Sequence, residues 1–202
     1  MYLNNYMDVS KTTPNGRIEI ICGCMFAGKT KELINRAQRA EIAGENVQAF
    51  KPDIDNRYTE DTICSHTAVE FAAKPVNNTE EGVESILDKV REDTDVVIID
   101  EANLFVDKLK TVVKSLSEQK YRIILAGLDQ DFRGEPFEPL PYLLAIADNV
   151  EKRTAICDNC GKPATKTQKF INGEPAPYDS SVIDVGASEK YEARCNNCHV
   201  VK

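Results

Sequence analysis

The chain has 202 residues, of which 42% are hydrophobic and 29% are charged, and its formal net charge is -8. This composition is ordinary for a soluble protein, and the length fits one sizeable domain or one domain with a small appendage. Acidic charge argues against a nucleic acid polymer as partner, because phosphate backbones attract basic surfaces. No apolar run reaches the ~20 residues that a membrane-spanning helix requires.

Short apolar runs alternate with stretches of helical periodicity along most of the chain. The first helical stretch has Leu33, Ile34, Ala37 and Ala40 at helical spacing and a glycine at its end. Such alternation is typical of a parallel sheet with right-handed crossover connections and helices on its faces. The predicted strands span 17–22, 47–52, 95–100 and 121–128, and the predicted helices span 29–44, 80–92, 105–119 and 140–148.

Three regions of different character divide the chain. Residues 1–16 are a polar lead-in without the charged and then apolar layout of a signal peptide, so we expect a cytoplasmic protein. Residues 17–150 carry the alternation and predict an α/β domain. After Val150, cysteine pairs, Gly, Pro and short β-like runs replace the long helices, which indicates a second, smaller domain over 151–202.

The turn between the first strand and the first helix reads GCMFAGKT, from Gly23 to Thr30. It fits the pattern G-x-x-x-x-G-K-[ST], in which backbone N–H groups and a helix N-terminus surround phosphate oxygens. Lys29 would reach the outer phosphates and Thr30 would hold Mg²⁺. The alternative is a tight turn with an incidental lysine, but the strand before it and the helix after it favour a phosphate loop.

A second candidate feature is the pair Asp100 and Glu101, which closes the apolar run VVII. A nucleotide site of this type needs a carboxylate near Mg²⁺ at the end of such a strand, and Asp100 fits that role. Glu101 is placed to take a proton from an attacking hydroxyl group or water. The alternative for Glu101 is a solvated loop acid.

The seven cysteines indicate a metal site rather than disulfides. Their odd number, in a chain without an export signal, argues against a disulfide framework. Two C-x-x-C turns together provide four thiolates, which suit a closed tetrahedral structural zinc site; His199 is a less favoured ligand. The four candidate ligands are Cys157, Cys160, Cys195 and Cys198. The other three cysteines are expected to be buried hydrophobic residues or incidental thiols.

The interval between the two cysteine pairs is longer than the ~15–20 residues common in zinc ribbons. Residues 161–194 must therefore leave the metal site and return to it, and a loop clamped at its base by a metal is suited to cover a substrate. The segment CNNCH also matches a haem attachment pattern. The second cysteine pair, the lack of an export signal and the scarcity of methionine argue against haem.

Taken together, several segments resemble thymidine kinases of the cytosolic, zinc-containing type. These segments run in the family's order from Arg17 to His199: GCMFAGKT, KPDIDNRYTEDTICSHT, DEANLF, GLDQDFRGEPF and the four cysteines with VGASEKYEARC. The resemblance implies a P-loop α/β domain, a zinc-anchored lasso over the nucleoside, and transfer of the ATP γ-phosphoryl group to the 5′-hydroxyl of thymidine or deoxyuridine. It also implies a homotetramer and feedback inhibition by thymidine triphosphate.

The resemblance also assigns roles to individual residues. It implies that Glu101 is the general base and that Asp100 lies beside Mg²⁺. The residues implied for the donor site with ATP and Mg²⁺ are Gly23, Cys24, Met25, Phe26, Ala27, Gly28, Lys29, Thr30, Asp55, Asn56, Arg57, Asp100 and Asn103. Those implied for the nucleoside site are Met25, Leu128, Phe132, Phe137, Tyr191 and the lasso strand Val182, Ile183, Asp184, Val185 and Gly186. Without the family, the phenylalanines would more often belong to the core.

The sequence departs from the family pattern at four positions. Cys24 stands where the phosphate loop usually has Pro, Asn103 replaces a Gln, Leu104 replaces an aromatic pocket residue, and Glu138 replaces a Gly. The phosphate-binding residues are untouched, so these departures bear on base affinity and selectivity. Two other functions stay open: a P-loop ATPase with a zinc ribbon acting on nucleic acid, and a non-catalytic zinc module that binds a partner.

Overall fold

A six-stranded parallel sheet forms the centre of the fold, in a computed structural model that describes residues 16–54, 62–64, 70–183 and 191–202. Neighbouring strands follow the order β5-β2-β6-β7-β1-β8, and every pair is parallel. The strands are β1 (Arg17–Gly23), β2 (Val47–Pro52), β5 (Lys74–Val76), β6 (Val96–Ile99), β7 (Arg122–Gly127) and β8 (Asn149–Arg153). The predicted α/β class is thereby confirmed.

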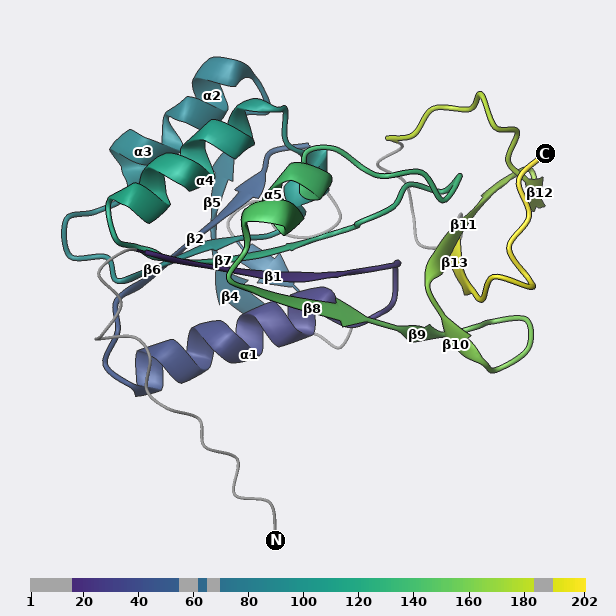
Figure 1. Cartoon of the computed structure of the whole chain (residues 1–202), viewed down its shortest axis with the longest axis horizontal. Coiled ribbons are helices and arrows are strands. Elements are labelled where there is room, and N and C mark those ends of the chain that lie inside the picture. Colours follow the sequence, from purple (N-terminus) through teal and green to yellow (C-terminus); the bar gives the residue numbers. More distant parts are fainter. Residues whose placement is uncertain (1–15, 55–61, 65–69, 184–190) are drawn as a thin grey trace, which may run out of the picture.

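Helices cover both faces of this sheet (Figure 1). One face carries α1 (Lys29–Ile42) and the antiparallel pair β3 (Thr62–Cys64) and β4 (Glu70–Ala72). The other face carries α2 (Glu80–Glu84), α3 (Ile86–Lys89), α4 (Lys108–Glu118) and α5 (Leu140–Ile146). Because β6 is covered on both sides, all four of its residues are buried, which explains its continuous apolar run.

Alternate side chains of β1, β2, β6 and β7 point into two separate hydrophobic cores. On the α1 face, Leu33 and Ile34 pack in one cluster with Ile98 of β6. On the opposite face, Leu109 of α4 packs in another cluster with Ile99. Full burial of each such side chain contributes about 1.5–3 kcal/mol. The helical spacing of the α1 core residues is thereby confirmed.

Some elements differ from the sequence-based expectation. The predicted helix 80–92 bends at Ser85, whose hydroxyl donates to the Gly82 carbonyl at 2.6 Å, and its helical part ends at Lys89. A side chain that bonds back to the preceding turn commonly bends a helix. Thr79 caps the start of α2, because its hydroxyl accepts the Gly82 N–H at 3.1 Å.

The C-terminal part of the chain forms a smaller lobe beyond the end of β8 (Figure 1). Here β9 (Ala155–Ile156) pairs with β10 (Pro163–Ala164), and β11 (Lys166–Ile171) lies between β12 (Glu174–Pro175) and β13 (Tyr191–Arg194). We call residues 155–183 and 191–202 the C-terminal lobe. Since β8 runs from 149 to 153, the central sheet leads directly into this lobe. Within the described ranges, the helices are too short or too polar to cross a bilayer.

Candidate active site

The turn between β1 and α1 has the backbone of a phosphate loop. Gly23 has a φ of 138°, and an added Cβ would lie 2.3 Å from the Arg153 carbonyl oxygen, so only glycine fits. Phe26 and Gly28 are left-handed, with φ of 64° and 72°, and Gly28 is the residue before α1. Left-handed residues in such a turn let successive backbone N–H groups converge on an anion. The predicted strand–loop–helix context of this motif is therefore confirmed.

The ammonium group of Lys29 lies across the same loop. Its Nζ donates to the Cys24 carbonyl at 2.8 Å, which keeps the positive charge beside the loop backbone. With the N-terminus of α1 at Lys29, charge and backbone dipole favour the same anion. Thr30 follows in the first turn of α1, where a hydroxyl can reach a cation bound to the phosphates.

The outer side of the phosphate loop rests on the C-terminal lobe. The Met25 N–H donates to the Thr167 hydroxyl at 3.1 Å, and the Cys24 thiol donates to the Ala164 carbonyl at 3.4 Å. Burial raises the pKa of the Cys24 thiol, so it keeps the proton that it donates. Cys24 and Ala27 also pack in one apolar cluster with residues of that lobe. The shape of the loop thus depends on residues ~140 positions away in the sequence.

Asp100 and Glu101 follow β6 at the sheet edge where β1 also ends. The carboxyl ends of parallel strands share one edge, and this edge is where α/β sheets bind their ligands. The buried Asp100 carboxylate accepts the Glu101 N–H at 2.9 Å. Glu101 is left-handed, with φ of 49°, and its carbonyl accepts the Leu104 N–H at 2.8 Å. Two acidic residues therefore lie at the edge of the sheet that also carries the phosphate loop.

Asn103 connects this strand end to the next one. It lies in the short helix η1 (Ala102–Leu104), is 2% exposed, and its Oδ1 accepts the Leu128 N–H at 2.7 Å. Its Nδ2 is a buried donor without a hydrogen-bond partner among the described residues. A buried amide donor in this state is costly unless a ligand or water accepts from it. The predicted role of Asn103 at the donor site stays a prediction.

The loop after β7 carries the phenylalanines expected at the nucleoside. Asp131 organises this loop, because its Oδ1 accepts the N–H groups of Arg133 at 2.8 Å and Glu135 at 3.1 Å. Phe132 is buried, while Leu128 and Phe137 are half-buried. The buried position of Phe132 is also compatible with ordinary core packing, so its contact with a nucleoside stays a prediction.

Strand β11 joins several residues of the expected nucleoside site. Its Thr167 holds Met25, and its Lys169 lies with Nζ 5.4 Å from the centroid of the Phe132 ring. Lys169 also pairs with Tyr191 of β13 in the antiparallel register. Met25, Phe132 and Tyr191 are therefore brought to one strand, although they are far apart in the sequence.

The beginning of the expected lasso strand is also anchored to β11. Lys169 is 2% exposed, and its Nζ donates to the Ser181 carbonyl at 2.7 Å. The Ser181 hydroxyl donates to the Ile183 carbonyl at 2.8 Å, next to Val182. The expected lasso residues Asp184, Val185 and Gly186 lie outside the described residues. So do Asp55, Asn56 and Arg57 of the expected donor site.

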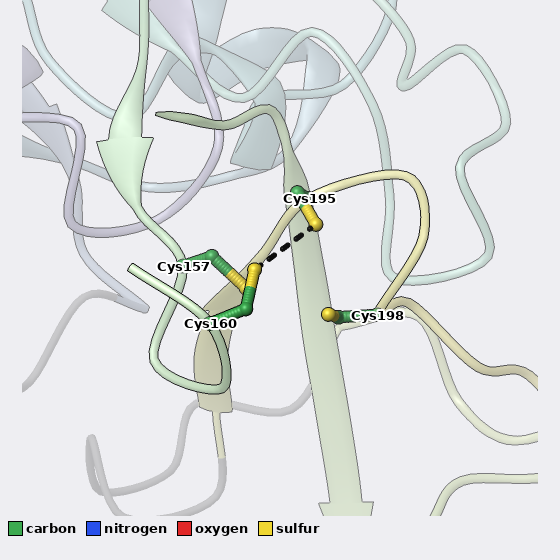
Figure 2. Close-up of side chains that lie close together, drawn as sticks. All are labelled: Cys157, Cys160, Cys195 and Cys198. Atoms are coloured by element: carbon green, nitrogen blue, oxygen red, sulfur yellow. Dashed lines mark hydrogen bonds between the residues drawn. The ribbon is translucent and has the colours of Figure 1, made fainter. Parts of the chain in front are cut away.

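The four cysteines of the two C-x-x-C turns come together in the C-terminal lobe. Figure 2 shows their sulfur atoms converging, and all four lie within 4.8 Å of one another. The Sγ atoms of Cys160 and Cys195 are 3.6 Å apart. A tetrahedral zinc with bonds of about 2.3 Å places its sulfurs about 3.8 Å apart. The donor set and its spacing fit zinc, with Cys157 and Cys198 as the other ligands.

Backbone hydrogen bonds shape the two turns that carry these cysteines. The Cys157 carbonyl accepts the Gly161 N–H at 2.8 Å, and the Cys195 carbonyl accepts the Cys198 N–H at 3.0 Å. Each pair thus sits on a tight turn that presents two sulfurs to the same point. His199 turns elsewhere, with its Nε2 2.8 Å from the Phe132 carbonyl oxygen. The structure therefore favours the four cysteines over His199 as the ligand set.

The thiols influence one another's ionisation. Burial opposes ionisation of Cys157, but hydrogen bonds from backbone N–H groups and from the Cys160 thiol outweigh it and lower the pKa of Cys157 to about 6. A backbone N–H favours the Cys160 thiolate, yet burial and hydrogen bonds to the neighbouring sulfurs raise the pKa of Cys160 to about 11. A divalent cation would replace these shared protons and hold all the sulfurs as thiolates.

Comparison with known proteins identifies the family. Residues 16–199 match the family model described as thymidine kinase. The chain belongs to the thymidine kinase family. Two curated relatives named thymidine kinase, from two strains of Halobacterium salinarum, are each 52% identical to it over 190 residues. The alignment covers 94% of this chain and 97% of each relative. The family resemblance carried by the sequence motifs is thereby confirmed.

Two departures from the thymidine kinase family pattern can be placed in the structure. Glu138 is exposed, and its carboxylate lies 2.7 Å from Nζ of Lys110 in α4, which raises the pKa of Lys110. Leu104 is half-buried, and its carbonyl accepts from the Asn78 side chain at 2.6 Å. Glu138, which stands where the family has Gly, therefore forms an ion pair at the surface.

Sequence reasoning missed the contacts that β11 makes with the phosphate loop and with the loop after β7. Thr167 and Lys169 are two residues apart, so their side chains share one face of the strand. Both are buried, which is unusual for Lys. The signal that the sequence did carry is a polar segment, TKTQK, between two cysteine turns. That segment alone does not reveal its partners, which lie in the phosphate loop and after β7.

Proposed function

We propose that the protein is a thymidine kinase that transfers the γ-phosphoryl group of ATP to the 5′-hydroxyl of thymidine, and also of deoxyuridine. The observation that carries this proposal is the family match over residues 16–199, which includes the phosphate loop and the Asp100–Glu101 pair. The geometry supports it, because both features follow strands that end at one edge of the sheet. ADP and a nucleoside monophosphate would be the products.

The donor phosphates would bind along the phosphate loop. Backbone N–H groups of the turn and the N-terminus of α1 favour their negative charge, and Lys29 lies beside that backbone. Asp55, Asn56 and Arg57 would complete this site, since a guanidinium can neutralise charge on the transferring group. Mg²⁺, when bound, supplies further positive charge at the phosphates, with the Thr30 hydroxyl and the Asp100 carboxylate as its protein ligands.

Glu101 would act as the general base. Its carboxylate accepts the proton of the 5′-hydroxyl while the 5′-oxygen forms a bond to the γ-phosphorus. The bond between the γ-phosphorus and the oxygen bridging to the β-phosphate breaks, and ADP leaves with that electron pair. Glu101 then returns its proton to solvent.

The nucleoside would lie between the phosphate loop and β11. We propose that Met25, Leu128, Phe132, Phe137 and Tyr191 contact its base and sugar. Backbone groups of Val182, Ile183, Asp184, Val185 and Gly186 would hydrogen-bond the edge of the base, and the cysteine cluster would hold zinc at the base of this lasso. We further propose a cytoplasmic homotetramer that thymidine triphosphate inhibits.

A panel of nucleosides with ATP and Mg²⁺ tests the proposed function. Thymine and cytosine present opposite hydrogen-bonding groups at N3 and C4, and one mispaired buried group costs about 1–3 kcal/mol. We therefore expect a high kcat/KM for thymidine and deoxyuridine and a much lower one for deoxycytidine. Equal efficiency with deoxycytidine would contradict the proposed recognition of the base by the backbone of the lasso. ATP hydrolysis stimulated by DNA, without monophosphate formation, would instead support the ATPase alternative.

A further inference from the structure

Arg153, the last residue of β8, contacts both ends of the phosphate loop. Its carbonyl oxygen lies against Gly23, where an added Cβ would approach to 2.3 Å. Its guanidinium Nε donates to the Ala27 carbonyl at 3.0 Å. Its Nη2 is 4.0 Å from the position that a Cβ on Gly28 would occupy. One residue from outside the sequence motif therefore borders the first and the last glycine of the loop.

The hydrogen bond from Arg153 to the Ala27 carbonyl affects the orientation of the Gly28 N–H. Ala27 C=O and Gly28 N–H belong to one planar trans peptide unit, in which the two groups point in opposite directions. A guanidinium that holds the carbonyl outward therefore keeps the Gly28 N–H turned to the inner side of the loop. That N–H immediately precedes Lys29, at the start of α1, and a helix N-terminus is a position that favours an anion.

The guanidinium of Arg153 is itself held by acidic side chains. Its Nη1 lies 2.5 Å from the Glu151 carboxylate and 3.7 Å from that of Glu32 in α1. Both carboxylates also pair with Arg36, which pairs in turn with the buried Glu19 of β1 at 3.0 Å. Arg153 is thus connected to the sheet and to the first turn of α1. This network fixes the orientation of its Nε toward the loop.

We propose that Arg153 is a positioning residue of the ATP site, which orients the Ala27–Gly28 peptide so that the Gly28 N–H meets the donor phosphates. This inference rests on the proposed function, because it concerns the donor site of that kinase. Arg153 acts through its hydrogen bond to the Ala27 carbonyl, so a neutral donor at the same position should serve in its place.

Two substitutions of similar length separate the hydrogen bond from the charge. In Arg153→Gln, the side-chain amide nitrogen occupies the position of the arginine Nε, so a neutral donor to the Ala27 carbonyl is kept. Arg153→Met has similar length but no donor. We expect Arg153→Met to raise the KM and Kd for ATP about three- to tenfold, the effect that loss of one such hydrogen bond corresponds to. Arg153→Gln should stay within about threefold of the wild type, and KM for thymidine should change little in both.

Steady-state kinetics and calorimetric titration with ATP decide between the outcomes. Arg91→Met serves as the control, since Arg91 forms an exposed ion pair with Asp93. An equal loss of ATP affinity in Arg153→Gln and Arg153→Met would mean that the charge, not the hydrogen bond, supports ATP binding. Unchanged ATP binding in both variants would mean that neither the charge nor the hydrogen bond does. Either result overturns the proposal, as would parallel losses for ATP and thymidine. Arg153→Leu replaces Arg153→Met if the latter does not fold. If the wild type binds ATP but phosphorylates no nucleoside, the proposed function fails, while the ATP titrations still test Arg153.

Discussion

At the scale of the single residue, the proposed general base, Glu101, has a strained backbone conformation. Glu101 is one of the few non-glycine residues in the described chain with a positive φ, and a left-handed backbone costs such a residue roughly 1–2 kcal/mol. The Asp100 carboxylate and the Leu104 N–H hold this conformation through hydrogen bonds of 2.9 and 2.8 Å. Strain that the surroundings maintain in this way is common at active sites. The Glu101 side chain therefore starts from a backbone that is held in one conformation at the end of β6.

The first prediction concerns the substitution Glu101→Gln. The amide has nearly the same shape but cannot accept the 5′-hydroxyl proton, so kcat should fall about 10²–10⁴-fold. The Kd for ATP, measured by calorimetric titration, should stay close to that of the wild type. Glu118→Gln, at the exposed end of α4, is the matched control and should keep full activity. Near-normal turnover of Glu101→Gln would remove Glu101 from the role of base.

At the scale of the element, the long buried strands and amphipathic helices were predictable, because each displays its own apolar pattern. β6 and α1 are clear cases. β5 and β8 were not predicted, since β5 has three residues and the edge strand β8 reads NVEKR. An edge strand is held mainly by backbone hydrogen bonds to one neighbour, so its side chains do not need to be apolar.

In the candidate site, too, features encoded by neighbouring residues were predictable, whereas contacts between residues far apart in the sequence were not. The phosphate loop and the cysteine turns were predictable because their residues lie in short motifs with a defined spacing. The contacts from Thr167 and Arg153 join residues 142 and 126 positions apart. No local pattern encodes such contacts, because they depend on how β8 and β11 pass the loop. The comparisons confirm the family, whereas the roles of individual site residues stay predictions.

The second prediction tests whether β11 supports the phosphate loop. Thr167→Val keeps the shape of the side chain but removes the acceptor of the Met25 N–H. The free energy of unfolding in urea should fall by about 1–3 kcal/mol, because a donor in a partly buried position loses its partner. Thr167→Ser, which keeps the hydroxyl, should recover most of this loss. Equal stability of the Val variant and the wild type would contradict a supporting role for this bond.

At the scale of the whole molecule, the cysteine cluster and the phosphate loop share one hydrophobic cluster. Cys24 and Ala27 of the loop pack there with Cys157 and Cys195 of the C-terminal lobe. The loop is also attached to the sheet through β1 and to α1, so it has anchors besides the lobe. The segment 161–194 has both ends at the cysteine turns. Loss of the metal should therefore loosen this segment more than the loop.

The third prediction follows from this difference in attachment. The purified protein should contain about one zinc per chain, measured by inductively coupled plasma mass spectrometry, and Cys157→Ser should lose it. Without the metal, KM for thymidine should rise more than KM for ATP, yet both should rise because the loop packs against the same lobe. Cys22→Ala removes a buried thiol outside the cluster and should retain its zinc. An active wild-type enzyme that contains iron or no metal would contradict the zinc assignment. A zinc-free Cys157→Ser variant with unchanged KM for thymidine would instead show that the metal does not order the nucleoside site.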